Sequence, residues 1–339
     1  MCWSLVFQYR YVVLHLASGD LPDLMDCLSI TLSNSLFLIK LIILWMKNRV
    51  FNEILKMMMD DWQECVTTQK NLEAVATRVT QSYRYSRYFV IFYIITVILF
   101  SSYILLVGER QLVLKAELPF DAKRSPYYEL VNTQQFLSQL SAASASSMLN
   151  ALLLTLLLHV DGQVEIIRRE LAEISVIAKK HESCKRMLRS SIARHQKVIA
   201  FARNIENIFT YIALVQFLAN TIVICSLGFV IVTSLNTDQR YAILSKLIPY
   251  YIVVNIEAFV LCFAGEFLSS RSVIIERAAY DTAWYELHPT ESRILLLMLI
   301  RAQRKLTLTA GKFMDLSLEE FAGMLKASGS YVSVLYAMY

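Results

Sequence analysis

Glycine, proline and charged residues are scarce in this chain. Its 339 residues include 8 glycines and 5 prolines, and neither low-complexity tracts nor internal repeats occur. Charged residues make up 18% and hydrophobic residues 56%, with a mean hydropathy of +0.46. A soluble protein of this size would expose too much apolar surface, so the composition favours a membrane protein. The net charge of +5 is spread over loops, so a nucleic acid is not an expected partner.

Motifs for catalysis and metal binding are also missing. The five histidines are scattered, without a His-x-x-x-His or Cys-x-x-Cys pair, and no glycine-rich phosphate loop or nucleophile elbow occurs. We therefore expect no enzymatic activity, no metal and no cofactor. The six cysteines lie in apolar runs or in segments predicted below to be cytosolic, so they imply no disulfide framework.

Long apolar runs dominate what is present. Six of them could each cross a bilayer as a helix of about 20 residues, and they cover 24–46, 87–108, 133–160, 207–233, 247–268 and 316–338. Before them, 3–16 is apolar but short and contains Arg10 and His15. It lacks the charged start and cleavage site of a signal peptide, so we interpret it as a truncated first span. The sequence thus predicts an all-α, polytopic membrane protein with seven transmembrane helices, the first incomplete.

Lysine and arginine are distributed unequally between the two sets of loops. The loops 47–87, 161–206 and 269–313 hold 24 of these residues, whereas the loops on the other side hold six. The positive-inside rule places the heavily charged side in the cytosol. With seven spans, the N-terminus is then cytosolic and the C-terminus extracellular, which is the reverse of a G-protein-coupled receptor.

The predicted cytosolic loops contain amphipathic stretches. Residues 51–62 and 164–177 carry apolar stripes at helical spacing, and 293–300 follows Pro289, where Thr290 is placed to cap a helix. A lone amphipathic helix of this length is unstable in water, so the stripes need the membrane surface or one another as partners. We favour packing against one another beneath the spans. The stripe residues are Ile54, Leu55, Met58 and Trp62 in the first stretch, and Ile167, Leu171, Ile174 and Ile177 in the second.

The last helix, predicted to start at 315–317, has two unlike faces. Its bulky face carries Phe321, Met324, Leu325, Ser328, Val332 and Leu335, whereas its slender face carries Gly323, Ala327, Ser330, Val334 and Met338. Such a helix could pack its bulky face against the rest of the chain and leave a narrow space beside its slender face. The alternative is that the slender side is a seam for close helix packing.

Two ionisable residues lie inside predicted spans, where charge is costly. Lys40 lies within two turns of the inner end of its span, so we expect its side chain to snorkel to the interface. Glu257 lies deeper, as either a buried hydrogen-bond hub or a polar spot in a cavity. Near the start of the last helix, Glu320 complements the helix dipole or attracts cations to an inner mouth. Lys326 would repel cations, so we expect it to point off the axis or the pore to contain few copies of this subunit.

Three short motifs stand late in the chain. They are Trp-Tyr-Glu-Leu at 284–287, Leu-Thr-Ala-Gly-Lys-Phe at 308–313 and the closing Ser-Tyr-Val-Ser-Val-Leu at 330–335. Together they resemble motifs of the insect odorant receptors. The resemblance covers roughly residues 22–339 and is densest after 260. Family co-receptors close with a glutamine near the end, whereas this chain has Tyr336-Ala337, so it looks like an odorant-tuned subunit.

The resemblance implies a function and a division of the chain. It implies an odorant-gated, non-selective cation channel, formed as a heterotetramer with a co-receptor in the plasma membrane of an olfactory neuron dendrite. It further implies a small volatile apolar ligand, and a cytosolic anchor where four subunits meet. Residues 1–268 would then hold the first six transmembrane helices with the ligand pocket, 269–313 the anchor segment, and 314–339 the pore-lining helix.

The resemblance also suggests site residues. By its closing motif, Val334 and Met338 take the apolar constriction of the pore, with Ser330 one turn inward; the slender face contains the same three residues. The odorant pocket would lie among the outer halves of helices two to six, although ordinary helix packing is the alternative for each of its residues. The pocket candidates are Ile30, Ser33, Phe100, Tyr103, Phe136, Leu140, Ala143, Tyr250, Tyr251 and Val254.

Three other classes of membrane protein fit the sequence less well. A G-protein-coupled receptor is disfavoured by the inverted topology, by the lack of cysteines in the outer loops and by the absence of an Asn-Pro motif before a final tyrosine. A secondary transporter is disfavoured because no repeat or broken pair of spans occurs. A gustatory receptor is the nearest rival, and the motifs at 284–287 and 306–313 lean away from it.

Overall fold

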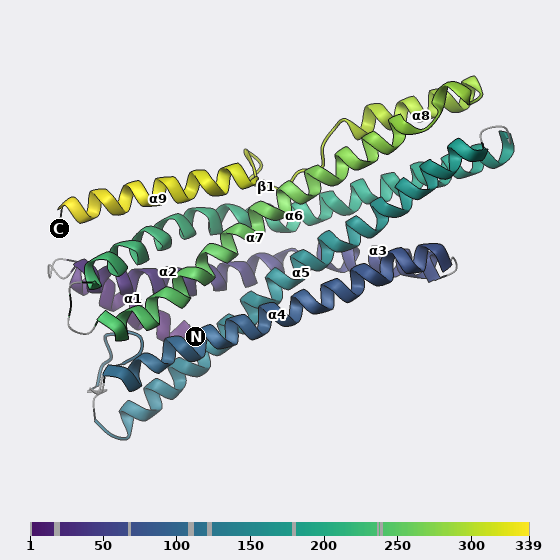
Figure 1. The fold of residues 1–339 in the computed structure, drawn as a ribbon. Helices are drawn as coiled ribbons and strands as arrows, with labels where there is room; N and C mark the ends of the chain where they lie inside the picture. The colour runs from purple at the N-terminus through teal and green to yellow at the C-terminus, as the bar shows by residue number, and fades with distance from the viewer. Residues whose placement is uncertain are drawn as a thin grey trace.

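The fold is a bundle of long helices. The computed structural model describes residues 2–16, 21–66, 69–107, 112–120, 124–177, 181–235, 237 and 240–338. In chain order the elements are α1 (Cys2–His15), α2 (Leu21–Met46), α3 (Asn48–Val66), α4 (Gln69–Val107), α5 (Tyr127–Ile177), α6 (His181–Ser234), α7 (Arg240–Asp281), the 3₁₀ turn η1 (Trp284–Glu286), α8 (Pro289–Ala302), β1 (Thr309–Ala310), β2 (Met314–Asp315) and α9 (Leu318–Met338). Figure 1 shows α4 to α7 running side by side, with α9 against one half of α6 and α8 at the opposite end.

The membrane-spanning helices agree with the sequence prediction for five of the six long apolar runs. Within the described ranges, α2, α4, α5, α6 and α7 are long and apolar enough to cross a membrane. The last helix, α9, has 21 residues but is not among these, because Lys326 and several serines and glycines lower its hydropathy. Its place in the membrane therefore stays a prediction.

Several helices are much longer than a bilayer is thick. α6 has 54 residues, which at 1.5 Å per residue is about 80 Å against a hydrocarbon core of about 30 Å. Its first half must therefore extend beyond the membrane, together with the end of α5. The predicted boundary at 268 likewise falls inside α7, which continues without a break to Asp281.

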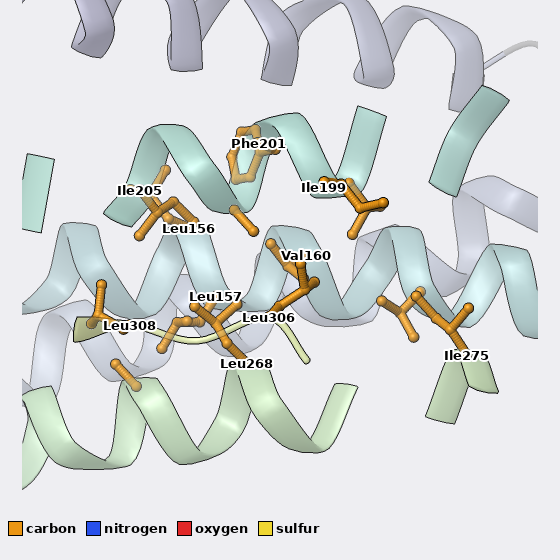
Figure 2. Packing of buried hydrophobic residues seen from close by; sticks show 14 of the residues in the cluster. Leu156, Leu157, Val160, Ile199, Phe201, Ile205, Leu268, Ile275, Leu306 and Leu308 are labelled. Atoms are coloured by element: carbon orange, nitrogen blue, oxygen red, sulfur yellow. The ribbon is translucent and has the colours of Figure 1, made fainter. Parts of the chain in front are cut away.

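The helical extensions pack against one another, as the apolar stripes predicted. Ile54 of α3 and Ile167, Leu171 and Ile174 of α5 are fully buried in one large core, which also includes residues of α6, α7 and α8. Figure 2 shows how Leu156, Val160, Ile205 and Leu268 meet in this core from three helices. Two positions of the first stripe differ from the prediction, because Leu55 and Trp62 are exposed. The side chain of Ile177 lies outside the described residues.

The start of α8 is capped differently from the prediction. Its N-cap is His288, whose ring nitrogen Nδ1 accepts from the backbone N–H of Thr290 at 3.5 Å, and Pro289 occupies the first turn. Thr290 itself is therefore not the cap. Proline suits this position because its missing N–H would have no helical partner there.

A small hairpin leads into α9 and explains the motif at 308–313. β1 and β2 pair antiparallel around Gly311 and Lys312, which both have positive φ angles, 63° and 66°. The N–H of Gly311 donates to the carbonyl oxygen of Thr210 at 3.0 Å, which fixes the hairpin to α6. Ser317 then caps α9 by accepting from the N–H of Glu320 at 3.2 Å.

The chain after the hairpin passes very close to α7 at Gly265. A Cβ atom on Gly265 would collide with the backbone of Leu316, so no larger residue fits. Gly265→Ala is expected to destabilise the protein by about 1–3 kcal/mol, because overpacking would force α7 and the start of α9 apart. The measurement is the thermal unfolding midpoint of the purified protein in detergent.

The matched control for that substitution is Gly329→Ala. A Cβ atom on Gly329 would meet nothing within 4 Å, and alanine favours the helix by about 1 kcal/mol over glycine. We therefore expect no loss of stability from Gly329→Ala. Equal melting temperatures for the two variants would contradict the tight passage at Gly265.

Candidate functional site

A cavity of about 110 Å³ lies among α2, α4, α5, α6 and α7. It runs along α2 from Ile30 to Lys40, a distance of about 15 Å at 1.5 Å per residue. Small residues on α5 (Ala142, Ala143 and Ser146) leave the space that bulkier side chains would fill. Its apolar wall is formed mainly by Ile30, Phe37, Val97, Phe100, Val253 and Val254.

The structure brings part of the predicted pocket together. The predicted residues that line the cavity are Ile30, Ser33, Phe100, Ala143, Tyr250 and Val254. Phe136, Leu140 and Tyr251 do not line it, and the side chain of Tyr103 lies outside the described residues. Tyr251 instead packs with a cluster that joins α6 to α9.

A buried ion pair forms the polar end of the cavity. Lys40 Nζ lies 3.0 Å from Glu257 Oε2, and Lys40 is only 4% exposed. The Tyr93 hydroxyl donates to Glu257 Oε1 at 3.0 Å, and Gln216 Nε2 donates to Oε2 at 2.9 Å. Asn150 Nδ2 in turn donates to the Tyr93 hydroxyl at 2.8 Å. Five polar side chains from five helices are thus linked in one network.

This network decides two expectations from the sequence. The prediction that Lys40 snorkels to the interface is wrong, because Glu257 binds its ammonium group inside the bundle. Glu257 accepts several hydrogen bonds and also lines the cavity, so both alternatives predicted for it are correct. Sequence reasoning missed Lys40 and Tyr93 as cavity residues. The available signal was the pair of ionisable residues within spans, which commonly marks function.

The segment after α4 closes the opposite end of the cavity. Val113 and Leu114 are buried in a small cluster with Ile30 and Phe100, and Tyr250 packs against it. The backbone of Leu114 makes two hydrogen bonds with the Gln135 amide of α5, at 3.1 and 3.0 Å. A non-helical segment thus covers the space between α2, α4 and α7.

The two faces of α9 are placed as the sequence predicted. All six bulky-face residues are at least partly buried against the rest of the chain, and Met324 and Ser328 are fully buried. On the slender face Ser330 is exposed, and Val334 and Met338 are 56% and 80% exposed. The slender face is therefore not a packing seam within the chain. Lys326 is exposed as well.

A packed cluster connects the cavity to α9. Val254 of the cavity wall and Met324 of α9 belong to one buried cluster with Leu227 of α6, and Tyr250 packs against it. Close contact continues further along α9, since a Cβ atom on Gly228 would come within 2.9 Å of Val332. Cavity and terminal helix are thus in continuous van der Waals contact.

Comparison with known proteins gives the family. A family model described as 7tm Odorant receptor matches residues 20–329. The chain belongs to the odorant receptor family. This odorant receptor homologue is 26% identical to Odorant receptor 10 of Aedes albopictus over 243 residues, which are 71% of the chain and 64% of that protein. It is 31% identical to Odorant receptor 22c of Drosophila melanogaster over 144 residues, 42% of the chain and 35% of that protein.

The fold is that of a solved insect olfactory receptor. The olfactory receptor OR5 from Machilis hrabei matches with a TM-score of 0.79 at 14% identity, over 100% of this chain and 88% of that one. The same receptor in complex with eugenol matches with a TM-score of 0.77. The chain spans less than two thirds of the length of the two curated relatives named above.

Proposed function

We propose that this protein is an odorant-tuned receptor subunit that forms an odorant-gated cation channel with a co-receptor. The observation that carries the proposal is the orientation of α9, whose bulky face packs on its own subunit while Ser330, Val334 and Met338 face outward. A slender, exposed face on a helix of this length is suited to line a conduit completed by other subunits. Apolar residues on such a face can gate by excluding water.

The cavity supports the ligand half of the proposal. It is enclosed by five helices, and its wall is largely apolar, so burial of a small volatile would supply most of the affinity. The cluster containing Val254 and Met324 gives a route from the cavity to α9. An odorant would open the channel if it binds the cavity more tightly when α9 has moved away from the pore axis. The shift of the equilibrium toward the open state can be no larger than this difference in affinity allows.

The proposed orientation places the end that carries α3 and α8 in the cytosol. That end holds the loops with 24 lysines and arginines, as the positive-inside rule requires. The exposed apolar residues Trp284, Leu296 and Leu297 would there contact other subunits in an anchor. The receptor would reside in the plasma membrane of an olfactory neuron dendrite.

The test is electrical recording from cells that express this subunit with and without an insect odorant co-receptor. We expect inward cation currents on exposure to a panel of small volatiles only when both subunits are present. The co-receptor alone, activated by its own agonist, is the control for channel assembly. Normal surface delivery of both subunits without any volatile-evoked current would contradict the proposal.

A further inference from the structure

The Lys40 ammonium group at the polar end of the cavity has more N–H donors than the protein gives it acceptors. Glu257 accepts from Lys40, Tyr93 and Gln216, and the Tyr93 hydroxyl both donates to Glu257 and accepts from Asn150. Lys40 carries three N–H donors, and Glu257 is the one acceptor for them found among the described residues. The carboxylate and the phenol are thus largely satisfied, whereas the ammonium group is not.

An N–H donor of a buried ammonium group that meets no acceptor within the protein favours an acceptor atom on a bound ligand. Lys40 is 4% exposed and lines the cavity, so bulk water reaches its ammonium group poorly. A hydrogen bond to a charged donor in such surroundings is stronger than one between neutral groups. A ligand atom that accepts from Lys40 would therefore gain affinity that an apolar atom at the same place cannot.

The charges at this end select against ionised ligands. Lys40 and Glu257 lie 3.0 Å apart and together have no net charge. A carboxylate bound to Lys40 would lie close to the Glu257 carboxylate and be repelled. An ammonium ligand would be repelled by Lys40 and would find Glu257 already occupied by three donors. A neutral acceptor avoids both costs.

We propose that Lys40 is a specificity-determining residue, and that the cavity prefers neutral volatiles with an apolar body and one carbonyl oxygen. The carbonyl oxygen accepts a hydrogen bond from Lys40 Nζ, while the apolar body of the ligand packs against Ile30, Phe100 and Val254 in the rest of the cavity. Ketones, aldehydes and esters fulfil this requirement, whereas hydrocarbons, carboxylic acids and amines do not. This inference rests on the proposed function, since it names the ligand class of the same cavity.

The test compares pairs of volatiles that differ only in the hydrogen-bond acceptor. Methyl pentyl ketone and acetophenone are each paired with the isostere in which a CH₂ group replaces the carbonyl oxygen; for acetophenone this is α-methylstyrene. Dose–response currents are recorded from the subunit co-expressed with co-receptor. For at least one pair, the native receptor is expected to respond to the ketone at a concentration about ten- to a hundredfold lower than to its isostere.

Variants connect this preference to Lys40. The double variant Lys40→Met with Glu257→Gln removes both charges together, and its ketone-to-isostere ratio is expected to fall to about one. Lys40→Arg keeps charged donors and should retain most of the preference. Lys47→Met is the matched control. Lys47 directly follows α2, the helix that carries Lys40, but its ammonium group donates to Asn207 outside the cavity. Surface labelling accompanies every recording.

The outcomes separate this inference from the function on which it rests. Currents of equal potency from ketone and isostere in the native receptor would overturn the ligand class and leave the channel function standing. A full preference kept by a surface-expressed double variant would overturn the role of Lys40. Absence of current from every volatile, while the co-receptor still responds to its own agonist, would overturn both. The native comparison needs no variant to fold, so it decides the ligand class by itself.

Discussion

Glu257→Leu is expected to prevent most of the receptor subunit from reaching the cell surface. The substitution leaves the Lys40 ammonium buried without its counter-charge and removes the acceptor for Tyr93 and Gln216. Breaking a buried ion pair by removing one partner costs about 3–5 kcal/mol, which is a large part of the 5–15 kcal/mol that typically stabilises a folded protein. Surface biotinylation and thermal unfolding in detergent measure the effect.

Two variants test whether the ion pair itself is the cause. Glu266→Leu lies on the same helix at an exposed position and is expected to change stability by no more than about 0.5 kcal/mol. The double variant Lys40→Met with Glu257→Gln should recover most of the surface expression, since it leaves no unpaired charge. If the Glu257→Leu variant reached the cell surface in the same amount as the Glu266→Leu variant, the ion pair would not hold α2 against α7.

The helices could be predicted from the sequence because their signal is local. Apolar runs of sufficient length mark the spans, and the stripe at Ile167, Leu171 and Ile174 correctly predicted the burial of these residues. The two faces of α9 followed from spacing alone, since residues three and four apart lie on one side of a helix. These features depend on the sequence of one segment at a time.

The cavity could be predicted only in part because its lining depends on how each helix is rotated against the others. Adjacent residues on a helix point about 100° apart, so Tyr250 lines the cavity whereas Tyr251 does not. Likewise Gln139 lines it and Leu140 does not. Spacing identifies a face of a helix but not which neighbour that face meets.

The Lys40–Glu257 pair shows a second limit. The two residues are 217 positions apart in the chain, and no local pattern connects them. Each was recognised as unusual within a span, but their pairing requires the packing of α2 on α7. The left-handed hairpin turn at Gly311 and Lys312 is similar, because it is hydrogen-bonded to Thr210 of α6, which is far away in the sequence.

Val334→Ser is expected to produce a standing cation current in the absence of odorant. We have proposed that Val334 forms an apolar ring with its counterparts in the assembled channel, and such rings block ions by excluding water. Burying or exposing a valine side chain is worth about 1.5–3 kcal/mol. Lowering the barrier to wetting by even about 1.4 kcal/mol would raise the rate of passage about tenfold. Whole-cell current with the co-receptor, before any volatile is applied, is the measurement.

Val332→Ser separates gating from packing, because it makes the same chemical change on the opposite side of α9. Val332 is partly buried and lies against Gly228 of α6, so its loss should lower surface expression without creating a leak. A larger residue at the gate, Val334→Phe, should instead reduce the odorant-evoked current, since it narrows the same ring. Native-like currents in both Val334 variants, at native surface levels, would place Val334 outside the conduit and would leave the exposed face of α9 without the role proposed for it.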